Sequence, residues 1–387
     1  MTQAFGGYQN EIYLQGMGGT RPAFSTDATR LEEAARGKLE PEPFWYVAGG
    51  AGSGATMRAN REAFDRWRLV PRMLREVSER DLSTTLFGTR LASPVLLAPV
   101  GVQGIVHPDG ELATARAAAA LDVPMILSTA SSTGMAEVAE ANGDGHRWYQ
   151  LYWPHDDEVT LSLLDRAKRA GFTALVVTLD TWTLAWRPHD LDNAYLPFLK
   201  GTGLAIPFGD PAFLAGLAKP PAEDLPAAIL RWLPMFNGRS HTWEQLSLLR
   251  ENWDGPIVLK GIQDVADARR AVDAGMDGIV VSNHGGRQVD GAIAALDALP
   301  AVAGAVGDQL TVLFDSGIRT GADVIKAIAL GAKAVLLARP YVYGLALDGE
   351  AGVRHVLRSL LADLDLTLGL AGHRSVAELG ADCLQRI

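Results

Sequence analysis

Short apolar runs rich in Val, Ile and Leu recur along the chain, and each is followed by glycine, serine, threonine or a charged residue. Within the runs the apolar residues are nearly continuous, whereas a strand with one wet face alternates apolar and polar residues. This continuity is typical of strands buried on both faces of a parallel sheet. The runs cover residues 94–101, 124–129, 146–152, 174–180, 256–261, 278–286, 310–317 and 334–340.

Segments with apolar residues at helical spacing separate the runs, as at residues 110–122, 156–171 and 263–275. Regular alternation of eight strands with helices predicts a closed (β/α)₈ barrel, the TIM barrel, rather than an open sheet. We expect a single domain over residues 1–387, with the barrel at about 94–340.

The chain on either side of the barrel is expected to cap it. A helix is predicted at residues 27–39 within a helical N-terminal extension, and apolar residues at helical spacing predict C-terminal helices from Glu350 onward.

A long insertion separates the fourth and fifth runs, at about residues 187–251. Its prolines predict a loop with short turns rather than long helices. Loops that follow strands lie at the barrel face where active sites are built, so we expect a lid over a pocket. An exposed decoration or an oligomer contact is the alternative. The prolines are Pro188, Pro197, Pro207, Pro211, Pro220, Pro221, Pro226 and Pro234.

Polar groups occur where the predicted strands end, and these ends converge on one mouth of a barrel. Ser128, Gln150 and Thr178 could donate to and accept from a flat heteroaromatic ring. Lys260 directly follows an apolar run, and its charge could offset negative charge on such a ring.

A phosphate site is predicted after the last two strands. Gly317 allows a turn whose N–H groups can hold an oxyanion, and Arg319 and Arg339 can pair with it. The seventh and eighth strands are where barrels of this kind commonly bind phosphate.

His284 is the leading candidate for a general base because it follows the sixth strand beside Asn283 and two glycines. Asp180, at the end of the fourth strand, could orient the imidazole and stabilise its cation. Arg187 and Arg287 would place two guanidinium groups near one pocket, which suits a carboxylate substrate. No His-Glu-x-x-His or similar spacing occurs, so no metal site is expected.

Composition and net charge narrow the class of protein to which this chain can belong. Of 387 residues 48% are hydrophobic, and 35 Lys and Arg against 45 Asp and Glu give a net charge of -10, which disfavours a nucleic-acid partner. The single cysteine, Cys383, can form neither an internal disulfide nor a thiolate metal site alone. The N-terminus lacks a signal-peptide pattern, and no run of about 18 apolar residues occurs, so we expect a soluble, cytoplasmic protein without a membrane partner.

Several motifs together resemble the FMN-dependent family of 2-hydroxy-acid oxidising enzymes. They are YQLY (149–152), TLDTW (178–182), LKGI (259–262), SNHGGRQ (282–288) and LFDSGIRTG (313–321). Within the family the chain is most similar to the lactate 2-monooxygenases. That similarity rests on YQNEIYLQG (8–16), YVAGGAGS (46–53), ANREAF (59–64), VPRML (70–74), WRPHDL (186–191) and the insertion.

The resemblance implies a role for each candidate residue. The substrate carboxylate is expected on Arg187, Arg287, Tyr152 and Tyr46, and the catalytic set is His284, Asp180 and Tyr152. The FMN contacts are expected at Pro99, Val100, Gly101, Ser128, Gln150, Thr178, Lys260, Ser282, Asp315, Ser316, Gly317, Ile318, Arg319, Ala338 and Arg339. Ala338 stands where the family usually has glycine, so the resemblance implies a looser backbone contact to the phosphate there, and Ala294 stands where proline is common.

The implied reaction oxidises a small L-2-hydroxy acid, with L-lactate expected first, and passes the electrons to dioxygen. If the keto acid stays trapped, peroxide decarboxylates it to acetate, carbon dioxide and water. The insertion and Gly101, at a position where simple oxidases of the family tend to carry alanine, favour trapping. The family also implies a homotetramer or a larger homo-oligomer.

Other functions stay open. The nearest is an oxidase that releases the keto acid and hydrogen peroxide, acting on lactate, glycolate or mandelate; the small residues Ala130, Ser131 and Ser132 leave space for an aromatic substrate. A quinone-linked membrane enzyme needs an apolar or basic anchor, which the insertion lacks. A non-catalytic flavin barrel is disfavoured by the presence of His284 and Arg287.

Overall fold

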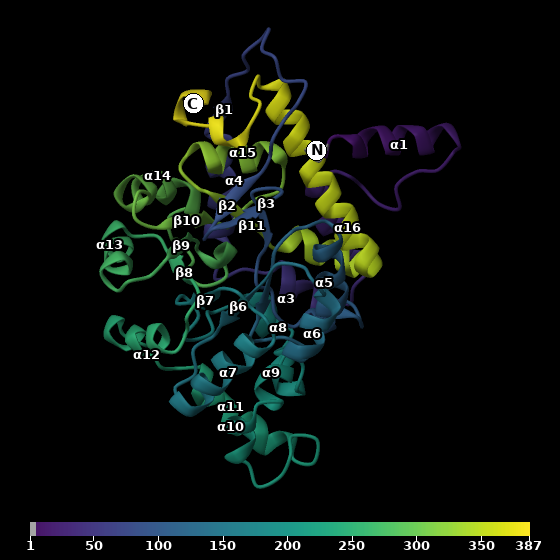
Figure 1. Ribbon diagram of the computed structural model, residues 1–387. Helices are drawn as coiled ribbons and strands as arrows, with labels where there is room; N and C mark the ends of the chain where they lie inside the picture. The colour runs from purple at the N-terminus through teal and green to yellow at the C-terminus, as the bar shows by residue number, and fades with distance from the viewer. Residues whose placement is uncertain (1–4) are drawn as a thin grey trace.

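The computed structural model describes residues 5–387. Its centre is a closed barrel of eight parallel strands in which each strand pairs with its neighbours in the chain and the last pairs with the first (Figure 1). The predicted (β/α)₈ barrel is confirmed. The strands are β4 (Val95–Leu97), β5 (Met125–Ser128), β6 (Arg147–Leu151), β7 (Leu175–Thr178), β8 (Ile257–Ile262), β9 (Gly278–Val281), β10 (Thr311–Phe314) and β11 (Ala334–Leu337).

Helices surround the barrel and bury one side of every strand. Alternate strand residues such as Leu97 and Leu127 belong to the large core cluster that contains the helix side chains. The intervening residues, such as Leu96 and Ile126, form a second cluster without helix residues, which fills the barrel interior. Both sides of each strand are therefore apolar, which explains the continuous runs. The helices are α5 (Gly110–Ala120), α6 (Met135–Asn142), α7 (Asp157–Arg169), α12 (Leu246–Glu251), α13 (Val265–Asp273), α14 (Ala295–Val306), α15 (Gly321–Ala329) and α16 (Arg339–Leu370).

The insertion is more helical than its prolines suggest. Helix α11 (Leu225–Phe236) contains Pro226 and Pro234, so the prediction of short turns alone is wrong there. Pro226 lies in the first turn, where no intrahelical N–H bond is lost, and Asp224 caps the helix by accepting from the N–H of Ala227. The other elements are short, as expected: α8 (Pro188–Asp192), η3 (Pro197–Lys200), α9 (Ala205–Phe208), α10 (Pro211–Ala215) and η4 (Trp243–Gln245).

The N-terminal extension is helical and packs against the barrel and α16. The helix expected at 27–39 is present as η1 (Ala28–Arg30) followed by α2 (Leu31–Arg36). The remaining extension comprises α1 (Gly7–Met17), α3 (Pro41–Ala48), α4 (Ala55–Asp65) and the hairpin β2 (Thr84–Leu86) and β3 (Thr89–Leu91).

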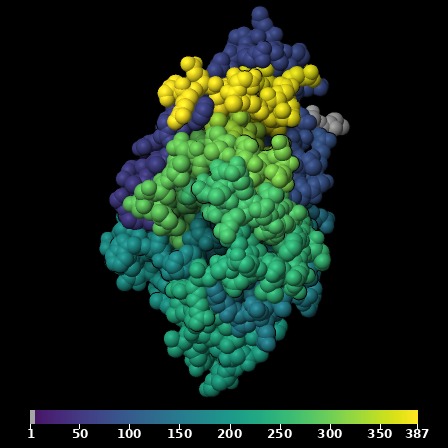
Figure 2. Space-filling view, turned by 90° about the vertical axis from the view of Figure 1, so that its left-hand side faces the viewer, coloured from purple at the N-terminus to yellow at the C-terminus, as the bar shows by residue number. Residues whose placement is uncertain are grey.

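The C-terminal segment returns to the N-terminal extension. Strand β12 (Leu384–Arg386), which follows the short turns η6 (Val376–Glu378) and η7 (Ala381–Cys383), pairs antiparallel with β1 (Trp67–Leu69). This small sheet lies at one end of the molecule and the helices of the insertion at the other (Figures 1 and 2). Within residues 5–387, no helix has both the length and the apolar character needed to cross a bilayer.

Candidate active site

A cavity of about 290 Å³ opens where the barrel strands end. Most of the residues predicted for the site line it. They are Tyr46, Pro99, Val100, Gly101, Tyr152, Arg187, Lys260, His284, Arg287, Asp315, Ser316, Gly317, Ile318, Arg319, Ala338 and Arg339. Ser128, Gln150, Thr178, Asp180 and Ser282 do not line it. Of these five, Asp180 and Ser282 hydrogen-bond to His284, which does line the cavity.

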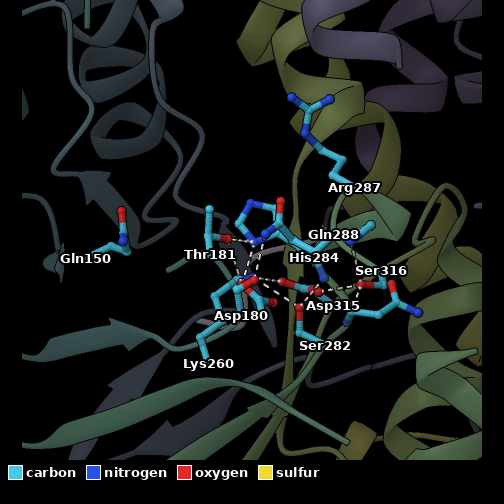
Figure 3. Close-up of polar contacts among 12 residues, drawn as sticks. Gln150, Asp180, Thr181, Lys260, Ser282, His284, Arg287, Gln288, Asp315 and Ser316 are labelled. Atoms are coloured by element: carbon cyan, nitrogen blue, oxygen red, sulfur yellow. Dashed lines mark hydrogen bonds and ion pairs between the residues drawn. The ribbon is translucent and has the colours of Figure 1, made fainter. Parts of the chain in front are cut away.

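His284 and Asp180 form a close pair, as the sequence predicts. His284 starts the turn η5 (His284–Gly286) directly after β9, and its Nδ1 lies 2.8 Å from Asp180 Oδ1 (Figure 3). The hydroxyl of Thr181 donates to the same carboxylate oxygen at 2.9 Å and lies 3.2 Å from Nδ1. Since Nδ1 faces a carboxylate, the favoured neutral tautomer carries its proton there and leaves Nε2 as a proton acceptor.

The electrostatics keep this pair in the neutral-imidazole, ionised-carboxylate state. Burial lowers the pKa of His284 below its ordinary value, although Asp180 opposes this shift. Burial would raise the pKa of Asp180, but His284 and Lys260 outweigh it and lower the pKa to about 2. The imidazole is therefore free to accept a proton at neutral pH, and the carboxylate is charged when it does.

Asp180 also borders a second cavity, of about 300 Å³, which shares Tyr152, Thr181 and Phe236 with the first. Among residues 5–387, its Oδ2 has no hydrogen-bond partner, and neither have Trp153 Nε1 and His241 Nδ1, which border the same cavity. The His241 ring is stacked between Trp153 and His155, with centroid distances of 3.9 and 4.0 Å. One oxygen of the carboxylate thus holds the histidine, while the other is buried without a hydrogen bond among the described residues.

Lys260 is paired within the protein, which the sequence did not reveal. Its Nζ lies 3.1 Å from Asp315 Oδ2 and donates to Ser282 Oγ at 3.0 Å (Figure 3). Burial would lower the pKa of Lys260, but Asp315 and Asp180 outweigh it and the pKa is raised. The ammonium group is held charged at the floor of the cavity, with part of its charge already balanced.

Two arginines bring positive charge to the cavity wall. Arg187, with 6% of its surface exposed, donates to the Arg287 carbonyl at 3.1 Å and to Gln288 Oε1 at 2.7 Å. Arg287 donates to the Gly49 carbonyl at 2.7 Å and lies over the Tyr46 ring, extending away from His284 (Figure 3). Burial, reinforced by Arg287, lowers the pKa of Arg187 to about 10, so Arg187 stays charged at neutral pH. Two guanidinium groups at one wall favour an anion.

The predicted phosphate end has the features of an anion cradle. Ser316 and Gly317 have positive φ angles of 81° and 117°, which turns backbone N–H groups toward one side. Arg339 donates only to the carbonyls of Val47, Gly49 and Gly285 and to a sulfur, and Arg319 only to the Ile318 carbonyl. Within residues 5–387, neither guanidinium has an ion-pair partner. Burial lowers the pKa of Arg339 to about 10, still far above neutrality.

Gln150 has a donor group with no partner. Its Oε1 accepts from the Ser128 hydroxyl at 2.8 Å and from the Thr129 N–H at 3.3 Å, which fixes the orientation of the amide. Its Nε2 is buried and has no hydrogen-bond partner in the part of the chain that the structure describes. A buried unpaired amide N–H costs roughly 1–3 kcal/mol, so this group fits a ligand with an acceptor atom, such as a ring carbonyl.

The insertion supplies an apolar wall that sequence reasoning described only as a lid. Phe198 of η3 and Trp232 and Phe236 of α11 line the cavity.

The prediction that Gly101 favours trapping of the keto acid is not supported by the packing around it. A Cβ atom at Gly101 would lie 2.8 Å from both Cβ and the carbonyl oxygen of Ala130. Glycine is required by this close packing between the loops after β4 and β5, and it does not leave free space.

Comparison with known proteins agrees with this geometry. A family model described as FMN-dependent dehydrogenase matches residues 35–386. An FMN-dependent alpha-hydroxy acid dehydrogenase from Penicillium citrinum is 54% identical over 387 residues, covering 99% of this chain and 96% of the relative. L-lactate oxidase from Lysinibacillus sphaericus is 43% identical over 351 residues, 90% of each chain. A crystal structure of mandelate oxidase superposes with a TM-score of 0.82 at 41% identity, covering 94% of this chain and 98% of that one.

Proposed function

Because the chain belongs to the family of FMN-dependent dehydrogenases, we propose that its cavity binds an L-2-hydroxy acid and oxidises it at C2, with dioxygen as the electron acceptor. The observation that carries this proposal is the single cavity shared by His284, paired with Asp180, and by Arg187 and Arg287. A base and two cations at one site suit a substrate with a hydroxyl group beside a carboxylate.

FMN fits the residues at the other end of the site. The unpaired Gln150 amide, the turn at Ser316 and Gly317, and the free guanidinium groups of Arg319 and Arg339 offer a donor for the ring and an anion cradle for the phosphate. When bound, FMN supplies the two-electron chemistry by accepting the hydrogen of C2 as a hydride equivalent. We assign the remaining FMN contacts to Pro99, Val100, Gly101, Ser128, Thr178, Lys260, Ser282, Asp315, Ile318 and Ala338.

The protein's own contribution is to orient the substrate and to hold a proton. Arg187 and Arg287, with Tyr46 and Tyr152, would hold the carboxylate so that the C2 hydrogen points to the cofactor. His284 Nε2 takes the hydroxyl proton, and the imidazole becomes a cation. Asp180 stabilises that cation as it forms in the transition state. This lowers the activation free energy of the reaction and does more than strengthen substrate binding.

For the fate of the keto acid we propose retention, as in a lactate 2-monooxygenase. Pyruvate held in the cavity reacts with the peroxide formed there, and lactate and dioxygen together give acetate, carbon dioxide and water. The apolar wall of Phe198, Trp232 and Phe236 supports this proposal, because it covers the cavity on the side of the insertion. Gly101 no longer supports it.

The second candidate is an oxidase that releases the keto acid with hydrogen peroxide. The same apolar wall favours an oxidase that acts on a substrate with an aromatic side chain, because Trp232, Leu233 and Phe236 of α11 line the cavity. Similarity to L-lactate oxidase and to mandelate oxidase is consistent with either side chain.

One experiment tests both levels of the proposal. Purified protein is mixed anaerobically with L-lactate, D-lactate, glycolate or L-mandelate, and bleaching of the flavin absorbance is followed. Bleaching by an L-2-hydroxy acid supports the oxidation, and no bleaching by any of them refutes it. Oxygen uptake with product assay then decides the finer point: acetate without peroxide supports the monooxygenase, whereas peroxide and free keto acid in equal amounts exclude it. Light scattering on the same sample tests the proposed homotetramer or larger assembly.

A further inference from the structure

Two buried asparagine side chains, far apart in the sequence, form a reciprocal amide pair. Asn60 Nδ2 donates to Asn283 Oδ1 at 2.8 Å, and Asn283 Nδ2 donates to Asn60 Oδ1 at 2.7 Å. Asn60 lies on α4 and Asn283 directly precedes His284. Only 2% and 4% of their surfaces are exposed, so solvent cannot replace either bond easily.

The orientation of both amides is fixed by further bonds. Asn60 Oδ1 also accepts from the N–H of Ala295, at 3.1 Å, and Asn283 Oδ1 from that of Gly286, at 3.1 Å. Asn283 Nδ2 donates in addition to the carbonyl of Ile293 at 3.1 Å. A flipped amide would set two donors or two acceptors against each other, so the pair has one arrangement.

The pair secures the turn that presents the imidazole. His284, Gly285 and Gly286 have positive φ angles of 56°, 63° and 75°, and for a histidine this left-handed conformation is strained. Such a conformation persists only where the surroundings impose it. Two sets of hydrogen bonds hold the turn in this conformation. The side chain of Asn283 is bound by Asn60, and Ser316 Oγ accepts from the backbone N–H groups of Asn283 and Gly285.

We infer that Asn60 is a positioning residue that directs the His284 imidazole toward Asp180 by holding Asn283. It lies on the far side of the turn, does not line the cavity and acts only through Asn283. The inference rests on the proposed function for the role of His284, but the orientation of the ring can be measured independently of turnover.

The decisive variant is Asn60→Asp. An ionised carboxylate at this position still accepts from Asn283 Nδ2 and the Ala295 N–H, but it cannot donate to Asn283 Oδ1. A protonated carboxyl group can donate, and burial favours that neutral form. The rate of flavin reduction by N60D, divided by the rate of the unmodified protein at the same pH, should therefore stay near one while this carboxyl group is protonated and fall about 10- to 100-fold as the pH rises through its pKa. Protonation of His284 at low pH slows both proteins alike and cancels in this ratio.

Asn142→Asp is the matched control. Asn142 is also buried, donates to the Ala115 carbonyl at 3.2 Å and accepts from Arg147 at 3.4 Å, but it does not line the cavity. This control should lose thermal stability while it keeps the reduction rate and its normal pH dependence. If N60D keeps the unmodified rate at every pH up to alkaline pH, or if the ratio of its rate to the unmodified rate does not change with pH, Asn60 has no positioning role.

Crystal structures of N60D at acidic and alkaline pH separate this inference from the proposed function. The imidazole is expected beside Asp180 at acidic pH and displaced from it at alkaline pH. If the unmodified protein reduces no flavin with any 2-hydroxy acid but the ring still moves in N60D, the proposed function fails and the positioning role stands. A ring that stays beside Asp180 in both structures overturns the positioning role.

Discussion

Replacing Asp180 by Asn removes the negative charge beside the base with little change in shape. The asparagine can still offer Oδ1 to His284 Nδ1, and its Nδ2 takes the place of Oδ2, which has no protein partner to lose. The hydrogen bond from Thr181 can also remain. The variant therefore tests charge stabilisation in the proposed proton transfer rather than packing.

The expected effect follows from the 2.8 Å contact between Nδ1 and Oδ1. A hydrogen bond to a charged group contributes about 1.5–3 kcal/mol, and two unit charges about 4 Å apart attract by about 4 kcal/mol at an effective dielectric constant near 20. Lys260 offsets part of the carboxylate charge. A loss of about 2–4 kcal/mol in transition-state stabilisation slows flavin reduction roughly 30- to 1,000-fold.

Anaerobic stopped-flow mixing with the best 2-hydroxy acid measures this rate directly. FMN content and melting temperature are measured on the same samples to show that D180N is folded and loaded. Asp365→Asn serves as the control, because Asp365 is a buried carboxylate paired with Arg80 at 2.6 Å outside the cavity. A D180N rate within about threefold of the unmodified protein refutes the assigned role, since even the weakest hydrogen bond to a charged group exceeds that loss.

Three further outcomes are expected. For the unmodified protein, kcat/KM should fall as the pH drops through the pKa of His284. Because burial lowers that pKa, the midpoint of the fall lies below the usual value of about 6.5. A midpoint above 6.5 contradicts the assignment of His284 as a neutral base. His284→Ala should keep FMN but lose flavin reduction, whereas Arg319→Ala should lose FMN on gel filtration, and the reverse pattern overturns both assignments. Gly101→Ala should lower the free energy of unfolding in denaturant by about 1–3 kcal/mol through overpacking against Ala130, and an unchanged value contradicts the close contact.

The barrel could be predicted because its signal is local. Each strand places alternate side chains in the interior and against the helices, so most strands are continuous apolar runs that can be recognised alone. The exceptions, β6 and β8, carry the site residues Gln150 and Lys260. The prolines of α11 misled the prediction because the position of a proline within a helix decides its effect. Pro226 lies in the first turn, where proline is well tolerated, and Pro234 lies inside the helix but only two residues before its end at Phe236.

The site was predictable as a set of strand ends but not as a set of contacts. The pairing of His284 with Asp180 follows from their positions at the ends of β9 and β7. The pairing of Lys260 with Asp315 and that of Asn60 with Asn283 have no local sequence pattern, because each partner lies on a different segment of the chain. Such contacts depend on how the segments pack, which short-range periodicity does not encode.

Arg319 and Arg339 have no ion-pair partner among residues 5–387. Burial is the main cause that lowers the pKa of each group, and neighbouring guanidinium groups add to it: Arg61 lowers the pKa of Arg319, and Arg287 and Arg319 lower that of Arg339. In the folded protein without cofactor, these guanidinium groups therefore repel one another, and a bound anionic cofactor would offset that repulsion. A ligand that binds only the folded state raises the free energy of unfolding by about 2.7 kcal/mol when its concentration is 100 times its Kd. The unfolded fraction of the chains falls correspondingly. The supply of FMN in the cell would then govern how long each polypeptide escapes proteolysis, as well as how fast it works.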